Sequence, residues 1–387
     1  MIRIAHIGTY VPQKCGIATY THHLRQSING AKGWRGTDEV FAVKPGASLQ
    51  RDPDSRIHEV EKEDRHAYRK LAERLNRSDI AVVSLQHEFG IFGGEAGEYV
   101  LDLVDHLEKP LAVTFHTVFE KPEEPYLRIQ KRIAERSDVI LVMNRLAADY
   151  LHGALGVPRE KIRCVPHGTP EPVPSMRDFT RGKLGWNGRK VLMTFGLLSR
   201  GKGLETVLQA LPEVVRQVPE ALYAIVGQTH PEVRKWEGES YREELQALIR
   251  ELKLEDHVVM IDRYLEEQEL AAMLTACDLY VTPYPGMQQI TSGTLAYAVG
   301  LGRPVLSTPY AYAKDLLQDL PDTLVPPGVA EAWAGRITAV LSDPKEAERL
   351  EREIGRIGAD MHWPKVGKLH LKLFNELAME RTAKQAN

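Results

Sequence analysis

The stretch of residues 281 to 308, VTPYPGMQQITSGTLAYAVGLGRPVLST, holds residue types suited to an anionic ligand. Its pattern predicts an apolar strand that ends at Pro283, then a loop, an apolar helix and a second strand. Ser292, Gly293 and Thr294 stand where that helix begins, and the unpaired N–H groups and positive dipole end of a helix start favour a phosphate. An ordinary strand–loop–helix connection with a capping hydroxyl explains the same pattern. On this stretch alone, both interpretations stay open.

A lysine in a glycine-rich loop is the second candidate for phosphate chemistry. Lys202 lies between Gly201 and Gly203, shortly after an apolar run at 190–196 that predicts a strand. Such a loop would carry the ammonium to the edge of a sheet, where a cation stabilises charge that develops on a leaving group. A solvated loop lysine is the alternative. Arg200 has a planar guanidinium that suits phosphate. The alternative is that the Arg200 side chain simply faces water.

Polar side chains also follow apolar runs in the first half of the chain. His116 comes directly after LAVTF at 111–115, and His87 and Glu88 come shortly after IAVVSL at 80–85. The carboxyl ends of parallel strands meet at one edge of a sheet, so a polar cluster there suits the hydroxyls of a ligand. A structural histidine at a strand end is the alternative for His116. Glu88 could also act as a general base or be a loop carboxylate.

Strands and helices are expected to alternate along the whole chain. The expected strands are 2–7, 39–43, 80–85, 111–115, 139–143, 162–165, 190–196, 221–227, 257–261, 278–282 and one after Pro304. Clear helical patterns occupy 17–28, 204–217, 240–253 and 266–276, and a charged helical tail at 344–384 is interrupted by Trp363-Pro364, which favours two helices. The fold class is therefore α/β with doubly wound parallel sheets. A proline-rich stretch after Gly168 marks a linker between two domains, 1–170 and 171–364.

Composition agrees with two globular domains and excludes several classes of protein. A chain of 387 residues is too long for one ordinary domain. With 50 basic and 53 acidic side chains, nothing indicates bulk nucleic-acid binding. The N-terminus has no signal-peptide profile and no apolar run is long enough to span a membrane, so we expect a cytoplasmic protein with at most peripheral membrane contact. The three cysteines fit no zinc spacing and are expected to be unpaired.

Several motifs occur in an order that resembles a known family. They are Gly8 to Gly16 after the first strand, His116 after LAVTF, Val165 to Gly168 before the linker, Gly196 to Gly203, and Gly302-Arg-Pro-Val. Together they resemble the retaining nucleotide-sugar glycosyltransferases of family 4, which have the GT-B fold, over essentially the whole chain. A bacterial subgroup of that family carries LQHEFGIFGG and QITSGTLAYA, matched here at 85–94 and 289–298.

The resemblance implies two Rossmann-like domains that face a central cleft. The second would grip a GDP- or UDP-sugar, the first would hold an acceptor, and helix 365–387 would cross back to the first. The reaction implied is transfer of a hexosyl group to a hydroxyl of a glycan or small molecule, with no cofactor and no metal. Asp52-Pro-Asp54 matches the DxD pattern of metal-dependent transferases, but it lies in a polar loop away from the expected donor site. The oligomeric state stays open.

The resemblance also implies roles for particular residues. Lys202 and the Ser292–Thr294 turn would contact the diphosphate, and His116 would orient the donor sugar. The usual family arginine falls on Leu197, so Arg200 is a candidate to replace it. Residues on the acceptor side would be Tyr10, His87, Glu88 and His167, with Gly16 approaching the donor.

Two expected carboxylates are missing. The paired glutamates of the family align with Gln289 and Tyr297, and Gln288 is an adjacent candidate for the first position. An amide can still bond sugar hydroxyls, although without charge, and Tyr297 could hold the ribose only in part or simply pack in the core. Two other functions therefore stay open. One is a glycoside phosphorylase on the same fold, in which inorganic phosphate replaces the nucleotide; the other is a non-catalytic sugar- or nucleotide-binding protein.

Overall fold

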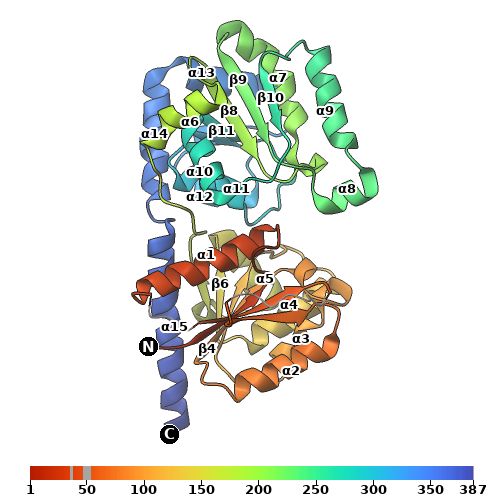
Figure 1. The fold of residues 1–387 in the computed structure, drawn as a ribbon, viewed down its shortest axis with the longest axis vertical. Coiled ribbons are helices and arrows are strands. Elements are labelled where there is room, and N and C mark those ends of the chain that lie inside the picture. Colours follow the sequence, from red (N-terminus) through yellow and green to blue (C-terminus); the bar gives the residue numbers. More distant parts are fainter. Residues whose placement is uncertain (35–37, 47–53, 387) are drawn as a thin grey trace. The chain divides into compact units, whose positions relative to one another are not determined.

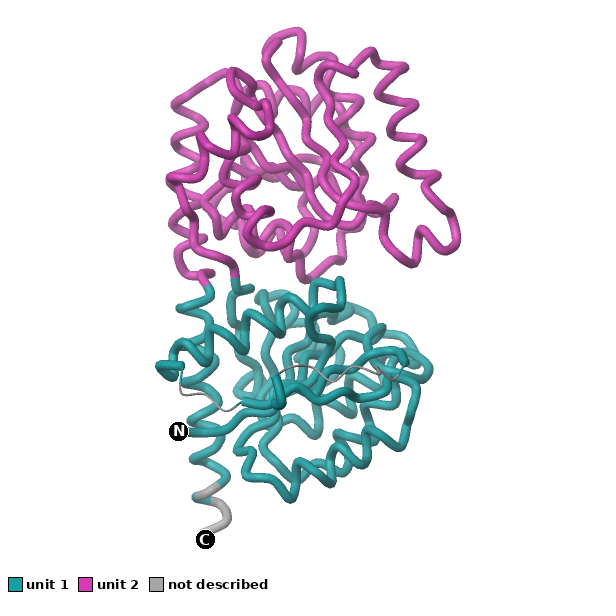
Figure 2. The backbone as a smooth tube through the Cα atoms, in the orientation of Figure 1, with its two compact units in different colours: residues 1–168, 363–387 teal, residues 169–362 magenta. Residues whose placement is uncertain are grey.

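The computed structural model describes residues 1–34, 38–46 and 54–386. The chain forms two compact units, shown in different colours in Figure 2. Unit 1 contains Met1–Gly168 and Trp363–Asn387, and unit 2 is the continuous segment Thr169–His362. Asp52 of the DxD match lies outside the described residues, whereas Asp54 is ion-paired with Arg25 in unit 1.

Unit 1 is built on a seven-stranded sheet with the order β3-β2-β1-β4-β5-β6-β7. All neighbouring strands are parallel. The strands are β1 Ile4–Gly8, β2 Glu39–Lys44, β3 Ile57–Glu61, β4 Val82–His87, β5 Leu111–Phe115, β6 Val139–Val142 and β7 Ile162–Cys164. The α-helices are α1 Gly16–Ala31, α2 Arg65–Asn76, α3 Val100–Val104, α4 Tyr126–Arg136, α5 Arg145–Leu155 and α15 Trp363–Ala386. Short 3-10 turns lie at η1 Phe89–Ile91, η2 Glu95–Gly97 and η3 Arg159–Lys161.

Unit 2 is built on a five-stranded parallel sheet with the order β10-β9-β8-β11-β12. Its strands are β8 Lys190–Phe195, β9 Ala221–Val226, β10 Val258–Ile261, β11 Leu279–Thr282 and β12 Val305–Ser307. Its α-helices are α6 Met176–Leu184, α7 Leu204–Gln217, α8 Pro231–Glu237, α9 Ser240–Glu251, α10 Glu267–Ala276, α11 Gly293–Gly300, α12 Ala311–Leu316, α13 Ala330–Ser342 and α14 Pro344–Gly358. The 3-10 turns η4 Arg200–Lys202 and η5 Pro321–Thr323 complete it. Figure 1 shows helices on both faces of this sheet.

The strand order in unit 2 creates a point where two loops separate. From β8 the chain continues outward through β9 and β10, whereas β11 lies on the other side of β8. In open parallel sheets, ligands bind at such a switch point, outside the carboxyl ends of the strands. The loops that follow β8 and β11 begin there, and they carry Lys202 and the Ser292–Thr294 turn.

The tail forms two helices, as the Trp363-Pro364 interruption predicts. Helix α14 ends at Gly358, where a Cβ would lie 2.2 Å from the carbonyl oxygen of Val299. Pro364 occupies the first turn of α15, where its missing N–H costs no hydrogen bond. Helix α15 runs along α1 in unit 1, and contact is so close that a Cβ at Gly367 would lie 2.3 Å from the Ser27 hydroxyl oxygen.

Candidate functional site

The loop after β8 in unit 2 begins with a glycine that leaves room beside two polar groups. Gly196 has φ +131°, and a Cβ there would lie 3.4 Å from Lys202 Nζ and 3.3 Å from the methyl group of Thr294. Behind it, a Cβ at Gly227 would lie only 2.0 Å from the Gly196 carbonyl oxygen. The missing Cβ at Gly227 lets the ends of β8 and β9 approach closely, and the missing Cβ at Gly196 lets Lys202 and Thr294 approach the end of β8.

A hydrogen-bonded chain joins the two candidate phosphate elements. Lys202 Nζ donates to the Tyr284 hydroxyl at 2.9 Å, and that hydroxyl is 2.8 Å from Thr294 Oγ1. Thr294 Oγ1 is in turn 3.1 Å from Ser292 Oγ. The Lys202 ammonium also lies 4.3 Å from the centre of the Tyr284 ring, a cation–π contact. The structure therefore brings together the lysine and the turn that were predicted separately, with Tyr284 between them.

Helix α11 begins with a capped turn that points its amides toward this cluster. Ser292 is the N-cap residue, and its hydroxyl accepts from the backbone N–H of Leu295 at 3.3 Å. Ser292 is buried, while Gly293 and Thr294 are partly exposed. First-turn N–H groups have no intrahelical acceptor, and together with the adjacent ammonium they are the donors that the predicted phosphate site would use.

The loop before this turn presents both glutamines to solvent. Gln288 and Gln289 are exposed, and the Gln289 amide donates to the Thr291 carbonyl oxygen at 2.8 Å. The backbone of the loop is fixed, because Tyr312 N–H donates to the Gln289 carbonyl oxygen at 3.0 Å. Gln289 thus has a defined backbone position and a side chain that solvent can reach.

Tyr297 is paired with a carboxylate that the sequence interpretation did not include. The Tyr297 hydroxyl donates to Glu267 Oε1 at 2.6 Å. Glu267 is partly buried in the first turn of α10, directly after the loop from β10. Tyr297 lies one turn into α11, with its ring 6.4 Å from that of Phe195 at the end of β8. A carboxylate therefore stands beside the position from which the expected glutamate is missing, supplied by another helix.

Arg200 does not join the cluster. Its guanidinium forms a bidentate ion pair with Glu244 of α9, at 2.6 Å for both contacts, and lies 3.5 Å from Glu237. It also stacks 5.5 Å from the Tyr241 ring. The Glu244 carboxylate raises the pKa of the guanidinium. In this conformation Arg200 binds α9, so a phosphate contact would require it to leave Glu244.

In unit 1, two predicted histidines meet around a tyrosine of α1. The rings of His116 and His167 lie 5.1 and 5.2 Å from that of Tyr20. His116 Nε2 is 3.0 Å from Gln86 Oε1, so Nε2 carries the proton and Nδ1 is left as an acceptor. His167 Nδ1 is 2.8 Å from the Gly168 carbonyl oxygen. Burial lowers the pKa of His116 to about 3 and that of His167 to about 4, so both rings are neutral near pH 7.

His87 and Tyr10, which were predicted to bind an acceptor, are both buried in unit 1. His87 is fully buried against Phe89, Phe92 and Phe115, and neither ring nitrogen has a hydrogen-bond partner among the described residues. Burial lowers its pKa to about 3. Tyr10 is 4 % exposed, and its hydroxyl lies 3.0 Å from His22 Nδ1. Both side chains belong to the core of unit 1.

Glu88 and Gly16 remain at the carboxyl edge of the unit 1 sheet. Glu88 accepts from the Thr117 hydroxyl at 2.5 Å and from the Phe89 N–H at 3.0 Å, and burial raises its pKa. Gly16 is exposed in the first turn of α1, where a Cβ would meet nothing within 4 Å. Cys15 caps that turn through its sulfur, which accepts from Ala18 N–H at 3.3 Å. The acceptor-binding role of Glu88 and the donor-side role of Gly16 stay predictions.

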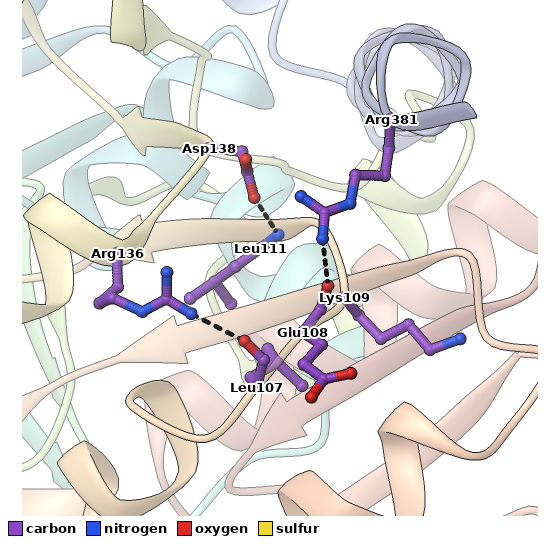
Figure 3. Close-up of a pocket in the computed structure, with 7 residues that line it drawn as sticks. All are labelled: Leu107, Glu108, Lys109, Leu111, Arg136, Asp138 and Arg381. Carbon is purple, nitrogen blue, oxygen red and sulfur yellow. Dashed lines mark hydrogen bonds between the residues drawn. The ribbon is translucent and has the colours of Figure 1, made fainter. Parts of the chain in front are cut away.

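A cavity of unit 1 lies at the opposite edge of its sheet. Figure 3 shows this cavity of about 200 Å³ beside Leu111, the first residue of β5. Arg381 of α15 donates to the Glu108 carbonyl oxygen at 3.1 Å, and Arg136 donates to that of Leu107 at 2.7 Å. Both arginines tie loops together, so this cavity is separate from the histidine cluster.

Residues 1–34, 38–46 and 54–386 contain no group of three or more His, Cys, Asp or Glu side chains placed to hold a metal ion. Among the same residues, none of the helices is both long and apolar enough to cross a membrane. No disulfide joins the three cysteines, Cys15, Cys164 and Cys277.

Two family models match successive parts of the chain. The model described as Glycosyltransferase Family 4 matches residues 39–171, and the model described as Glycosyl transferases group 1 matches residues 176–355. Curated relatives include the GDP-mannose-dependent alpha-(1-6)-phosphatidylinositol monomannoside mannosyltransferase of Mycolicibacterium smegmatis, 29% identical over 40% of this chain and 38% of that protein. Another is the GDP-mannose:glycolipid 4-beta-D-mannosyltransferase of Xanthomonas campestris, 29% identical over 48% of each chain. The chain matches only about half the length of these relatives or less.

Solved structures show the same fold over nearly the whole chain. HepE of Anabaena, in complex with UDP and glucose, has a TM-score of 0.76 at 16% identity and covers 97% of this chain and 100% of that one. WaaG, a glycosyltransferase of lipopolysaccharide biosynthesis, has a TM-score of 0.67 at 15% identity over 96% and 99% of the two chains. With its two parallel-sheet units and both family matches, the chain belongs to family 4, group 1, of the glycosyltransferases and has the α/β GT-B fold.

Proposed function

We propose that the protein is a retaining glycosyltransferase that moves a hexosyl group from a GDP- or UDP-sugar to a hydroxyl of a glycan or small-molecule acceptor. The observation that carries this proposal is the cluster formed by Lys202, Tyr284 and the capped start of α11. An ammonium beside a helix N-terminus offers the charge and N–H donors that a diphosphate requires. GDP-mannose, the donor in the names of both mannosyltransferases, and the UDP bound to HepE support the same class of ligand.

The proposed reaction uses the leaving group as the base. The bond between the sugar C1 and the β-phosphate oxygen breaks, and a bond from the acceptor oxygen to C1 forms on the same face. The acceptor proton passes to the leaving phosphate. Lys202 and the first-turn N–H groups of α11 stabilise the charge that develops on that phosphate. His116 Nδ1, a neutral acceptor, orients a sugar hydroxyl, and no protein nucleophile or metal ion is required.

Glu267 favours a nucleotide over inorganic phosphate as the leaving group. A carboxylate accepts two hydroxyl hydrogen bonds, which matches the diol of a ribose. Glu267 stands beside Tyr297, one helical turn beyond the phosphate-binding residues of α11. This spacing fits a nucleoside diphosphate that extends from the helix start toward α10.

Ligand-induced stabilisation tests the proposed function. A ligand that binds only the native state raises the free energy of unfolding, by about 2.7 kcal/mol at a concentration one hundred times Kd. We expect UDP or GDP to raise the melting temperature and inorganic phosphate to have no comparable effect. Stabilisation by phosphate and sugar phosphates, with none by any nucleotide, would instead identify a phosphorylase. Nucleotide binding without turnover on a broad acceptor panel would identify a binding protein.

Replacing Glu267 with glutamine should weaken nucleoside diphosphate binding about tenfold, because hydrogen bonds to charged groups contribute about 1.5–3 kcal/mol. The loss should shrink when the 2′-deoxy nucleotide is used, since one hydroxyl partner is then already absent. Isothermal titration with both nucleotides measures this difference. Glu266→Gln, at the exposed neighbouring position, is the matched control. Equal losses for the ribo- and deoxynucleotides would remove Glu267 from the ribose site.

Replacing Gln289 with glutamate should leave donor binding intact. The side chain is exposed and its backbone is fixed from α12, so the change restores a carboxylate without disturbing the loop. Donor affinity can be measured by titration with a nucleotide sugar. A large loss of affinity would argue against contact between position 289 and the transferred sugar.

A further inference from the structure

Tyr284 lies at the centre of the phosphate cluster, although nothing in its sequence context marks it as a functional residue. It follows β11 and Pro283, and its side chain is 1 % exposed. Its hydroxyl lies between Lys202 Nζ at 2.9 Å and Thr294 Oγ1 at 2.8 Å. One buried hydroxyl therefore touches both elements that would hold the diphosphate.

The hydrogen bond between Lys202 and Tyr284 has only one possible direction. An ammonium is a donor only, so the Tyr284 oxygen accepts from Lys202, whereas either hydroxyl can be the donor between Tyr284 and Thr294. Lys202 has three N–H bonds, and this contact fixes the direction of one of them. The remaining two are thereby oriented as well, and they are the ones available to phosphate oxygens.

Ring stacking and a backbone hydrogen bond hold the Tyr284 ring in a defined position. It stacks on Tyr310 at 5.5 Å with an interplanar angle of 16°. Its carbonyl oxygen accepts from the Thr308 hydroxyl at 2.6 Å. The lysine loop is clamped against the same segment, because a Cβ at Gly203, where φ is +58°, would lie 2.5 Å from the Pro283 carbonyl oxygen. Both partners of the Lys202–Tyr284 bond are thus anchored by backbone.

We propose that Tyr284 is a positioning residue that holds the Lys202 ammonium over the start of α11 and directs its N–H bonds at the leaving phosphate. This role rests on the proposed function for its effect on turnover, but not for its effect on Lys202 itself. The ring supplies a cation–π contact that keeps the ammonium in place, and the hydroxyl sets its orientation. Tyr284→Phe separates the two contributions, because it keeps the ring and removes only the hydroxyl.

A ligand-free measurement tests the contact directly. Lysine reacts with acetic anhydride only as the neutral amine, and a hydrogen bond donated by the ammonium slows that reaction. Acetylation of Lys202, followed by peptide mass spectrometry, should be about fivefold faster in Tyr284→Phe, the factor that corresponds to one net hydrogen bond. Tyr310→Phe removes a hydroxyl from the same ring stack without touching Lys202 and should leave the rate unchanged. An unchanged rate in Tyr284→Phe would overturn the proposal.

A double-mutant cycle tests the functional role. Tyr284→Phe should lower kcat about tenfold with little change in donor KM, since misplacement of a catalytic group costs that much or more. In a Lys202→Ala background the same change should have no further effect, because Tyr284 acts through Lys202. Losses that multiply would show a general structural role and overturn the proposal. If the wild-type protein neither binds nor turns over any nucleotide sugar, the proposed function fails, while the acetylation rates still decide the positioning role.

Discussion

Lys202→Ala should lower the turnover of a nucleotide sugar at least ~100-fold, the usual cost of removing one contact that stabilises transition-state charge. The ammonium is the positive group of the cluster, and its Nζ lies 3.4 Å from the position that a Cβ at Gly196 would occupy. Because the charge on the leaving phosphate grows as the C1–O bond breaks, the loss should appear mainly in kcat. Steady-state kinetics with a nucleotide sugar and a responsive acceptor measure it.

A control separates this effect from a general loss of positive charge. Lys235 is an exposed lysine of the same unit, whose ammonium lies 5.0 Å from the Trp236 ring. Lys235→Ala removes the same charge far along the chain from the cluster and should retain wild-type turnover. Wild-type activity in Lys202→Ala would place the leaving group elsewhere.

Unit 1 should lose stability steeply when the pH falls below about 6.5. Four of its histidines have a pKa lowered by burial, to about 3 for His87 and His116 and to about 4 for His167 and His370. Their folded-state values lie below the unfolded value of 6.5, so the unfolded chain binds more protons and stability rises with pH in this window. The stabilisation is complete above pH 6.5 and is lost as the pH falls toward the folded values. Each histidine contributes about 1.4 kcal/mol per pH unit to the slope.

His87 offers the sharpest test of this pH dependence. Its ring packs among Phe89, Phe92 and Phe115, so His87→Phe keeps an aromatic ring and removes the titrating group. The variant should lose about 1.4 kcal/mol per pH unit of the slope between pH 6.5 and 5, measured by denaturant unfolding. His66→Ala, at an exposed position of α2, should leave the slope unchanged. If His87→Phe keeps the wild-type slope, protonation of this ring does not drive acid unfolding.

The elements that sequence patterns predict best are those whose local signals agree. Strand β5 at Leu111–Phe115 and helix α7 at Leu204–Gln217 have the bounds expected from their apolar run and their helical period. Strand β3 was missed because Ile57–Glu61 reads IHEVE, with charged side chains that a partly exposed edge strand tolerates. A strand at the end of a sheet needs less apolar surface, and its pattern is correspondingly weak.

The candidate phosphate-binding residues were easier to predict from the sequence than the residues that contact them in the structure. Lys202 and the Ser292–Thr294 turn stand out through glycines and position after a strand. The tyrosine that joins them does not, because Tyr284 looks like an apolar residue at a strand end and its contact with Lys202 spans 82 positions. The burial of His87 could not be predicted, for a related reason. A polar residue after a strand indicates an exposed edge only if nothing covers it, and here Phe89 and Phe92 fold back over the ring.

Glu267 lies beside the position from which the family carboxylate is missing, and it comes from another helix. Alignment compares residues at the same position in the chain, so the change to tyrosine at position 297 reads as the loss of an acid. In the folded protein that tyrosine bonds a carboxylate 30 positions away. A glutamate that opens a predicted helix directly after a strand of the same sheet was the available signal.

Helix α15 has a consequence for how the protein is made. Unit 1 is completed by residues 363–387, and α1, near the start of the chain, packs against that last helix. Synthesis therefore delivers the whole of unit 2 before the partner of α1 emerges from the ribosome. Unit 2 enters and leaves at neighbouring points, since Thr169 N–H donates to the Met361 carbonyl oxygen at 2.8 Å. During translation unit 2 can therefore fold before α15 has been synthesised. The apolar surface of unit 1 that α15 covers stays exposed until that helix is made.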